Sequence, residues 1–308
     1  MEITKLLQKI TKAKNRQVSL CKHIEEEDIN TARQIHFCGS YLGFRDWTAH
    51  DVQTLRTANF CKLHWLCRAC AYRRSMKMVS SYHKKFLELS PLVEEKGLIP
   101  FSATLTVANG HDLAERVAHL KSAWRRQSEA ARRSSTGANG SKIAPEWSKV
   151  AGGVRALEVT KNVETGQWHP HFHVFGFLSS YIDQEKWSKE WLNLTGDSYV
   201  VGVSKVKGDP FLALLEVLKY TVKFSSLSDE ELWFTYKVMK GSHCVFPFKL
   251  FRGVTTGDLN TDDETGLDGP FVDYVAKWVF GEGRFNIEKR PFKLSYERSK
   301  KEVRVSDV

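Results

Sequence analysis

Three histidines alternate with other residues in the segment 168–174, which reads WHPHFHV. Residues two apart in a β-strand point to the same face, so His171 and His173 would project together while Phe172 points to the other face. Paired imidazoles are costly to bury unless a ligand uses their lone pairs, and a divalent metal does so directly. We therefore predict metal ligands at His171 and His173, with His169 as a further candidate. The alternative is a pair of surface histidines or hydrogen-bonded core histidines.

A carboxylate interrupts the apolar segment 154–161, VRALEVTK, at Glu158. If this segment and the histidine segment form a hairpin whose turn centres between Glu164 and Thr165, Glu158 lies directly opposite His171 on the same face. A register one residue away would turn it to the wrong face. An unpaired carboxylate would be expensive in such a run. Two imidazoles and one carboxylate suit Mg²⁺ or Mn²⁺, with open positions for substrate oxygens.

A tyrosine with a possible role as nucleophile lies in the helical segment 211–224, FLALLEVLKYTVKF. Glu216 and Lys223 lie four residues before and three residues after Tyr220, so all three share one helix face. A phenol is a poor nucleophile at neutral pH unless a nearby cation or a metal-polarised phosphate lowers the barrier. We predict that Tyr220 attacks phosphorus with assistance from Lys223. The alternative is a half-buried tyrosine between solvated lysines.

Cysteines are concentrated near the N-terminal end of the chain. The pair Cys67 and Cys70 has the C-x-x-C spacing that closes around Zn²⁺, and a second pair would complete a tetrahedral structural site. We predict Cys38 and Cys61 as that pair, with His36 and His64 as rivals for the fourth position. The alternative is a few buried cysteines that are close by chance. Two further cysteines are predicted to be unpaired and inert, namely Cys21 and Cys244.

The basic residues beside the C-x-x-C pair indicate a polyanionic partner. Arg68, Arg73 and Arg74 are predicted to meet DNA phosphates. The whole chain of 308 residues has 46 Lys and Arg against 36 Asp and Glu, a formal net charge of +10, which favours association with polyanions. We find no long apolar segment and no secretion signal, so we expect no membrane association and a cytoplasmic location in a bacterium or archaeon.

The elements that must position these residues follow the order β-α-β-β-α-β-α. This order predicts an α+β fold in which an antiparallel sheet carries helices on one face. Helical patterns also cover 1–35, 75–89 (ending before Pro91) and 228–240, and the remaining tail has no assigned role. The predicted strands are 99–107, 154–161, 169–178 and 199–206, and the predicted helices between and after them are 111–133, 182–194 and 210–224.

Three segments together resemble a known family. They are FSATLT at 101–106, HPHFHV at 169–174 with LEVT upstream, and EVLKYTVK at 216–223. Over residues 36–226 the chain resembles plasmid rolling-circle replication initiators of the single-tyrosine type, within the HUH endonucleases. The resemblance implies a ferredoxin-like core in which Tyr220 forms a 5′-phosphotyrosyl link and leaves a free 3′-hydroxyl. It also implies that Glu216 activates water to end the round, and that the cysteine pattern is a structural zinc module.

The resemblance further implies a domain order and a set of partners. We expect an N-terminal helical and zinc-binding module at 1–90, the catalytic domain at 91–226 and a C-terminal extension at 227–308. The expected partners are single-stranded or cruciform origin DNA, a host DNA polymerase and, because no phosphate-binding G-x-x-x-x-G-K-[ST] loop is present, a separate host helicase.

Two other functions stay open at this point. One is a transposase or mobilisation relaxase with the same chemistry, although no second tyrosine lies in the 211–224 segment and Tyr236 is the nearest other candidate. The other is a non-catalytic, zinc-containing DNA-binding protein whose histidines are structural. That protein would bind DNA without forming a covalent adduct.

Overall fold

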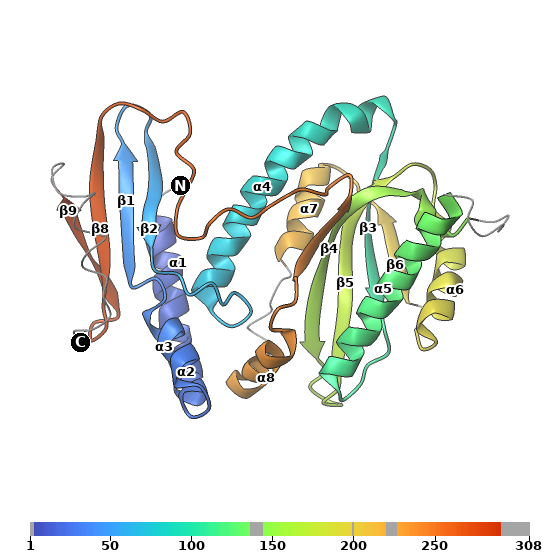
Figure 1. Ribbon diagram of the computed structural model, residues 1–308, viewed down its shortest axis with the longest axis horizontal. Helices are drawn as coiled ribbons and strands as arrows, with labels where there is room; N and C mark the ends of the chain where they lie inside the picture. The colour runs from blue at the N-terminus through green and yellow to red at the C-terminus, as the bar shows by residue number, and fades with distance from the viewer. Residues whose placement is uncertain (1–2, 136–143, 199, 220–226, 291–308) are drawn as a thin grey trace. The chain divides into compact units, whose positions relative to one another are not determined.

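The computed structural model describes residues 3–135, 144–198, 200–219 and 227–290 (Figure 1). The chain forms two compact units. Unit 1 comprises Met1–Arg74 and Gly257–Val308, and unit 2 comprises Ser75–Thr256. Among the described residues, no helix combines the length and the apolar character needed to cross a membrane.

Unit 2 is built on a five-stranded antiparallel sheet with the strand order β6-β3-β5-β4-β7. The elements follow one another as β3, α5, β4, β5, α6, β6 and α7, which is the predicted order, and the predicted α+β class is confirmed. The strands are β3 (Ile99–Thr106), β4 (Val150–Lys161), β5 (Trp168–Leu178), β6 (Val201–Lys205) and β7 (Val245–Lys249).

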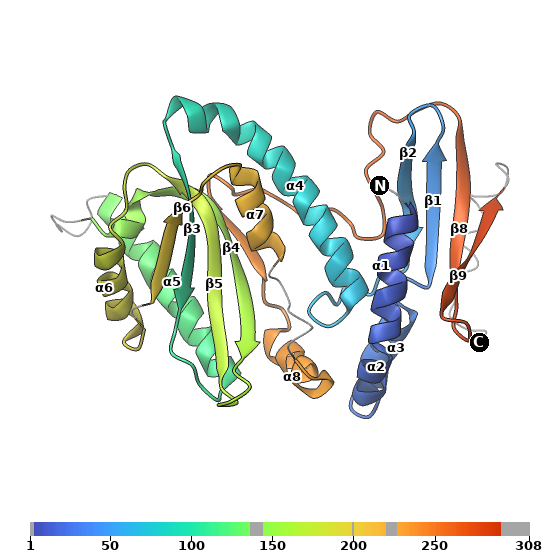
Figure 2. The same ribbon diagram turned by 180° about the vertical axis from the view of Figure 1, so that it is seen from behind.

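Two helices of unit 2 cover one face of this sheet and a third covers the other. On the first face, α5 (Leu113–Ser135) places Trp124 with its ring centroid 5.5 Å from that of Phe172, and α6 (Gln184–Thr195) packs beside α5. On the second face, α7 (Pro210–Lys219) packs on β4 and β5. The prediction that the helices lie on one face of the sheet holds for α5 and α6. It does not hold for α7, which packs on the opposite face (Figures 1 and 2).

The rest of unit 2 consists of the short 3-10 helix η1 (Glu146–Lys149), α8 (Asp229–Met239) and the greater part of α4 (Arg68–Glu95), within which the unit boundary falls. The N-terminus of α8 is fixed by a capping box between Ser228 and Glu231. We predicted that the helix containing residues 75–89 would end before Pro91. Instead α4 continues through Pro91, and the Ser90 hydroxyl donates to the carbonyl of Phe86 at that turn.

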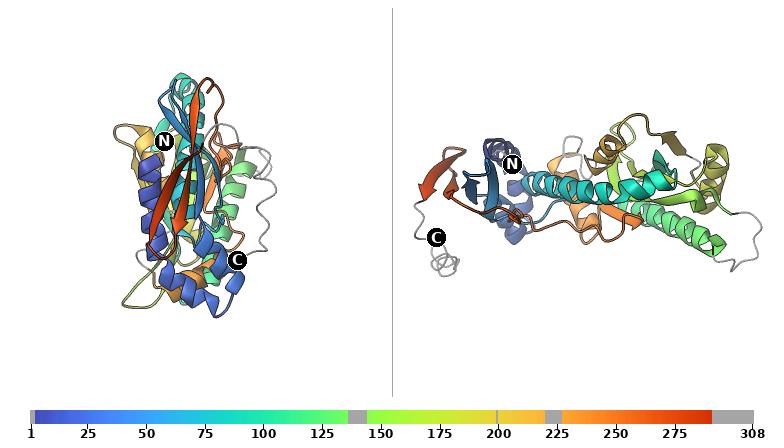
Figure 3. Two further views of the ribbon diagram at one scale, coloured as in Figure 1. Left: turned by 90° about the vertical axis from the view of Figure 1, so that its left-hand side faces the viewer. Right: turned by 90° about the horizontal axis from the view of Figure 1, so that it is seen from above.

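Unit 1 is a four-stranded antiparallel sheet with the order β2-β1-β8-β9. Strands β1 and β8 lie more than 200 residues apart in the sequence, yet they are hydrogen-bonded neighbours in this sheet (Figures 1 and 3). The strands are β1 (Tyr41–Trp47), β2 (Val52–Ala58), β8 (Phe271–Val279) and β9 (Arg284–Arg290), and the helices are α1 (Ile3–Arg16), α2 (Val18–Glu25) and α3 (Ile29–Phe37).

The observed division differs from the three consecutive domains that we expected. Residues from Gly257 onward belong with the N-terminal unit because β8 pairs with β1 along its whole length. Residues 227–256 belong with unit 2 because β7 forms the edge of its sheet beside β4. The expected C-terminal extension is thus divided between the two units.

Candidate metal centre and adjoining pocket

Glu158, His171 and His173 converge on one face of the unit 2 sheet. The β4–β5 hairpin has the predicted register, with Glu158 directly opposite His171. Glu158 Oε2 lies 3.1 Å from Nε2 of His171 and 2.6 Å from Nε2 of His173, and the two Nε2 atoms are 3.0 Å apart. Glu158 and His171 are buried, and His173 is partly exposed.

The outer nitrogen of His171 indicates which tautomer this ring adopts. Nδ1 of His171 lies 3.2 Å from the carbonyl oxygen of His169, which only accepts, so this nitrogen carries the hydrogen. In a neutral ring the Nε2 lone pair of His171 then points at the carboxylate of Glu158 and at the second imidazole. Electron-rich atoms this close repel one another unless a cation lies among them.

The separations among the three ligand atoms fit such a cation. Neighbouring ligands of an octahedral ion at about 2.1 Å from the metal lie about 3 Å apart. The separations between the two imidazoles and between His171 and Glu158 are close to that value, and the separation of 2.6 Å between His173 and Glu158 is shorter. The donor set of two nitrogens and one carboxylate oxygen therefore fits Mg²⁺ or Mn²⁺ with positions left for substrate oxygens.

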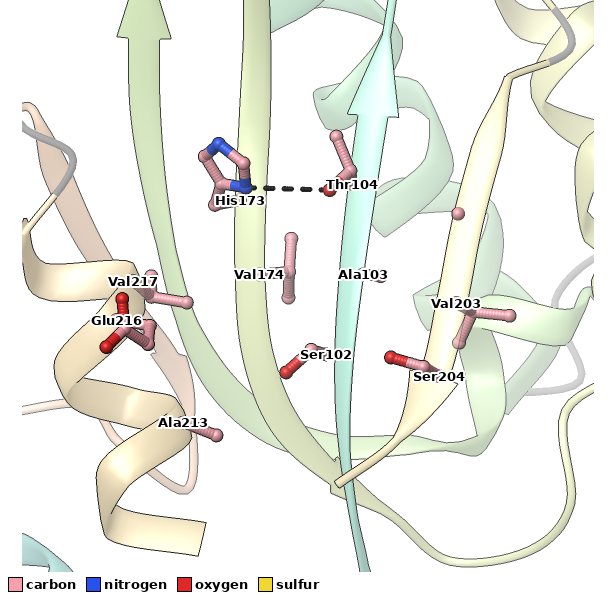
Figure 4. Close-up of a pocket in the computed structure, with 11 residues that line it drawn as sticks. Ser102, Ala103, Thr104, His173, Val174, Val203, Ser204, Ala213, Glu216 and Val217 are labelled. Carbon is pink, nitrogen blue, oxygen red and sulfur yellow. Dashed lines mark hydrogen bonds between the residues drawn. The ribbon is translucent and has the colours of Figure 1, made fainter. Parts of the chain in front are cut away.

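Two side chains that the sequence analysis did not single out lie beside the histidines, Thr104 and Asn109. Thr104 of β3 pairs with His173 across the sheet, and its Oγ1 lies 3.5 Å from Nδ1 of that ring (Figure 4). Asn109 lies beside His169, with 2.5 Å between Oδ1 and Nδ1. The alternation of the predicted strand 99–107 could have placed Thr104 on the histidine face.

The structure does not bring His169 into the ligand group. Its ring is adjacent to that of His171, with centroids 4.9 Å apart, but its Nδ1 faces Asn109. Burial lowers the pKa of His169, and the neighbouring His171 lowers it further. His169 therefore contributes its backbone carbonyl, which orients His171.

A pocket of about 420 Å³ adjoins the metal centre (Figure 4). It is lined by His173 from β5, by small residues of β3 and β6, and by one face of α7 that includes Glu216. The structure thus brings Glu216 and His173 to the same pocket. Tyr220 and Lys223 directly follow the described part of α7 and lie outside the described residues. Tyr236, the other candidate, is buried on α8 with its ring stacked on Trp233.

In unit 1, four cysteine thiols form a second cluster with the chemistry of a metal site. The Sγ atoms of Cys38, Cys61, Cys67 and Cys70 lie within 4.8 Å of one another. Three of the Sγ–Sγ separations are 3.4–3.5 Å, close to the roughly 3.8 Å of a tetrahedral zinc thiolate site with about 2.3 Å bonds.

The surroundings of the thiols fit a negatively charged metal site. Backbone N–H groups of Cys61 and Lys62 donate to two of the sulfurs. Lys14 is buried beside the cluster and donates to the carbonyls of His36 and Cys38. Burial lowers the pKa of Lys14, while the nearby cysteines raise it.

The other histidines and cysteines considered for the four-cysteine cluster lie outside it. The ring of His36 stacks on Phe280, and His64 lies outside the four-sulfur group, so neither rival is needed. Cys21 and Cys244 are buried and lie outside the four-sulfur group, and burial raises the pKa of Cys21 to about 11.

Of the three arginines predicted to contact DNA, Arg73 does not fit the prediction. Arg73 is only 2% exposed, and its guanidinium donates to the carbonyls of Leu259 and Thr261 and to the Asp262 carboxylate. Its charge ties α4 to the segment before β8 within unit 1, and it cannot reach DNA. Arg68 and Arg74 are half-buried and stay predictions.

The family model described as "Replication protein" matches residues 52–246, which is more than half of the chain. The chain belongs to this family, and the resemblance to replication initiators is confirmed at that level.

Curated relatives carry the name "Protein rep". One from a Bacillus species is 29% identical over 219 residues, covering 62% of this chain and 66% of that protein. One from Bacillus amyloliquefaciens is 29% identical over 219 residues, covering 62% and 60%. One from Staphylococcus aureus is 26% identical over 233 residues, covering 71% and 94%. The chain thus spans 60–66% of the length of the two Bacillus relatives. No solved structure matches the chain.

Proposed function

We propose that this chain is a rolling-circle replication initiator that nicks and rejoins one DNA strand at a plasmid origin through a phosphotyrosine intermediate. The observation that carries the proposal is the convergence of Glu158, His171 and His173 beside a pocket that α7 also lines. A Mg²⁺ or Mn²⁺ ion held by these three residues would supply Lewis-acid polarisation of a phosphate. Membership of the replication protein family supports this choice among metal-dependent activities.

The covalent step belongs to Tyr220. Its oxygen forms a bond to the scissile phosphorus, and the bond from phosphorus to the 3′-oxygen breaks. The tyrosine loses its proton to solvent, and the departing 3′-oxygen takes one up, which leaves a 5′-phosphotyrosyl strand and a 3′-hydroxyl that can prime a polymerase. Lys223, three residues further along the sequence, would stabilise the negative charge that develops at phosphorus.

The release step belongs to Glu216. This carboxylate lies in the pocket beside His173, four residues before Tyr220. It would accept a proton from water as that water attacks the phosphotyrosyl bond, so that the round ends by hydrolysis. Unwinding and synthesis are assigned to a host helicase and polymerase.

The test uses single-stranded oligonucleotides tiled across both strands of the DNA that flanks the gene, incubated with the full chain and Mn²⁺. We expect one oligonucleotide to give an adduct that survives denaturing electrophoresis, and we expect Tyr220→Phe to form none. The control Tyr236→Phe should retain the adduct because that ring is buried on α8. An adduct in Tyr220→Phe would refute the nucleophile, and DNA binding without any adduct would favour the non-catalytic alternative.

A second variant separates nicking from release. Glu216→Ala should form the adduct at the normal rate and accumulate it, because only the hydrolytic step needs this carboxylate. Normal multiple turnover by Glu216→Ala would dismiss its role in activating water. The Tyr220 assignment would be unaffected by that result.

A further inference from the structure

Arg155 is a half-buried cation whose hydrogen-bonding groups are not used by any residue that the structure describes. It lies on β4 with its side chain on the α5 face of the sheet, opposite to the face of Glu158. Its Cζ atom lies 4.7 Å from the ring centroid of Trp124, 4.1 Å from that of Phe172 and 5.1 Å from that of Phe246. Within the described residues, the guanidinium makes neither a hydrogen bond nor an ion pair, and its Nε is buried.

The lack of a polar partner distinguishes Arg155 from the structural arginine of unit 1. Arg73 uses its guanidinium on two carbonyls and a carboxylate. A guanidinium has five N–H donors, and donors that are removed from water without an acceptor are costly. Aromatic faces attract the charge but do not accept all of these N–H groups. Burial alone accounts for the lowered pKa of Arg155, about 10, since no acidic group offsets it.

A second cation, Lys121, lies on the helix whose Trp124 ring contacts Arg155. Lys121 is on α5, one turn before Trp124, and its Nζ donates to the hydroxyl of Ser242. Burial lowers the pKa of Lys121, and the positive charge of Arg155 lowers it further. Over the described part of the chain, neither cation has a carboxylate within ion-pair distance. Two cations without a neighbouring carboxylate repel each other, and an anion bound between them would relieve that repulsion.

The exposed ring next to this pair indicates the kind of anion. Phe246 pairs with Arg155 across the edge of the sheet and is 41% exposed, although it is a large apolar side chain. Cations that hold phosphates beside an aromatic face on which a base can stack are the usual elements of single-strand binding.

We propose that Arg155, Lys121 and Phe246 form a second nucleic-acid contact, in which the two cations bind a phosphate of single-stranded DNA and the ring stacks on an adjacent base. This site lies on the sheet face opposite the metal centre and takes no part in strand cleavage. The choice of DNA as the source of the phosphate rests on the proposed function, but binding at this site does not depend on the metal.

The test measures binding without metal, so that failure of the nicking proposal is recorded separately. A 5′-fluorescein single-stranded 20-nucleotide DNA of mixed sequence is titrated with the full chain in EDTA, and fluorescence anisotropy is followed over a series of NaCl concentrations. Arg155→Met/Lys121→Met should bind about tenfold more weakly. The slope of log K against log salt should fall by about 0.7, since the two cations contact one phosphate and each phosphate contact on a single strand contributes about 0.7.

The controls match charge and folding. Lys84→Met/Lys189→Met removes the same net charge from exposed positions of unit 2 and should change the affinity less than twofold. Methionine at position 155 can fill the space between the three rings without burying a charge, so folding should be retained. Lys121→Met alone, a change on the helix surface, provides a second variant and should weaken binding about threefold.

A further arm distinguishes a free phosphate from the DNA backbone. Inorganic phosphate is added at constant ionic strength, and the thermal midpoint is compared between the wild-type chain and the double variant. If phosphate raises only the wild-type midpoint while both proteins bind the oligonucleotide equally, the assignment to DNA is wrong. Equal affinities for the oligonucleotide in all variants, or an equal loss in the charge-matched control, would overturn the site.

Discussion

The carboxylate of Glu158 faces the imidazole of His171 across the β4–β5 hairpin, with 3.1 Å between Oε2 and Nε2. Both side chains are buried, so neither charge nor lone pair is relieved by bulk water. This pair therefore has the properties of two ligands of one cation, and the affinity for that cation should depend on the charge of Glu158.

Replacement of the Glu158 carboxylate by an amide should weaken metal binding strongly while leaving the fold intact. Glu158→Gln keeps the size of the side chain but removes the charge, and we expect Mn²⁺ affinity to fall at least about 100-fold, since even groups that only support a ligand contribute 10–100-fold. Isothermal titration calorimetry with MnCl₂ measures this directly. Glu164→Gln, in the exposed turn of the same hairpin, is the control. Unchanged Mn²⁺ affinity in Glu158→Gln would exclude this carboxylate as a ligand.

Gly202 allows the pocket beside His173 to be narrowed without strain. A Cβ at Gly202 would meet no atom within 4 Å, and the residue lines the pocket. Gly202→Leu should change the free energy of unfolding by no more than about 0.5 kcal/mol. It should slow adduct formation about tenfold or more, because its side chain would occupy space needed by the DNA strand. Gly257→Leu, equally open but outside the pocket, should do neither. Normal adduct formation in Gly202→Leu would show that DNA does not enter there.

Zinc should belong to the four-cysteine cluster of unit 1. We expect about one zinc per chain by inductively coupled plasma mass spectrometry, and we expect Cys67→Ser to lose it. Since metal-binding free energy contributes to folding in such modules, residues 1–74 should become sensitive to protease in that variant. Cys21→Ala, at a buried thiol outside the cluster, should keep its zinc. Full zinc content in Cys67→Ser would contradict the assignment.

Glu146 should contribute a pH-dependent part of the stability of unit 2. Its side chain is 2% exposed and accepts hydrogen bonds from Lys149, Lys186 and the backbone N–H of Asp183. Burial raises the pKa of this carboxyl, but these donors outweigh it, and the net pKa is below the ordinary value of 4.5. A depressed pKa in the folded state stabilises the protein above the unfolded value and ceases to do so as the pH falls through the folded value.

Glu146→Gln should therefore lower the free energy of unfolding by about 1–3 kcal/mol at pH 7. The difference from wild type should shrink as the pH falls below about 4.5, because the wild-type carboxyl then takes up a proton in the unfolded state and, below its lower folded-state pKa, in the folded state as well. Urea unfolding at pH 7, 5 and 3.5 measures this. Glu185→Gln, whose carboxylate is exposed, should differ little from wild type at any of these pH values. A constant difference for Glu146→Gln across the series would contradict the predicted pKa.

The sequence predicted the centre of unit 2 well because the information there is local. Alternation in the β4 and β5 segments, together with the short turn between them, determined which side chains share a face, and the register of Glu158 followed from counting. The C-x-x-C spacing of Cys67 and Cys70 indicated their cluster in the same way.

Long-range pairing could not be predicted from such patterns. The strands β1 and β8 are short, and nothing in either segment indicates its partner more than 200 residues away. The prediction that Arg73 contacts DNA was wrong for a similar reason, because its hydrogen-bond acceptors come from distant residues, namely Leu259, Thr261 and Asp262. Thr104 and Asn109 were missed because their roles depend on neighbours in other strands and loops.

The discontinuity of unit 1 has a consequence for the order in which the protein forms on the ribosome. All of unit 2 has been synthesised before the chain reaches Gly257, so its sheet can close while translation continues. The β1–β2 hairpin, made before unit 2, must wait for Phe271–Val279 before its sheet gains the next strand. This hairpin is therefore translated before unit 2 but acquires its third strand only after unit 2 is complete.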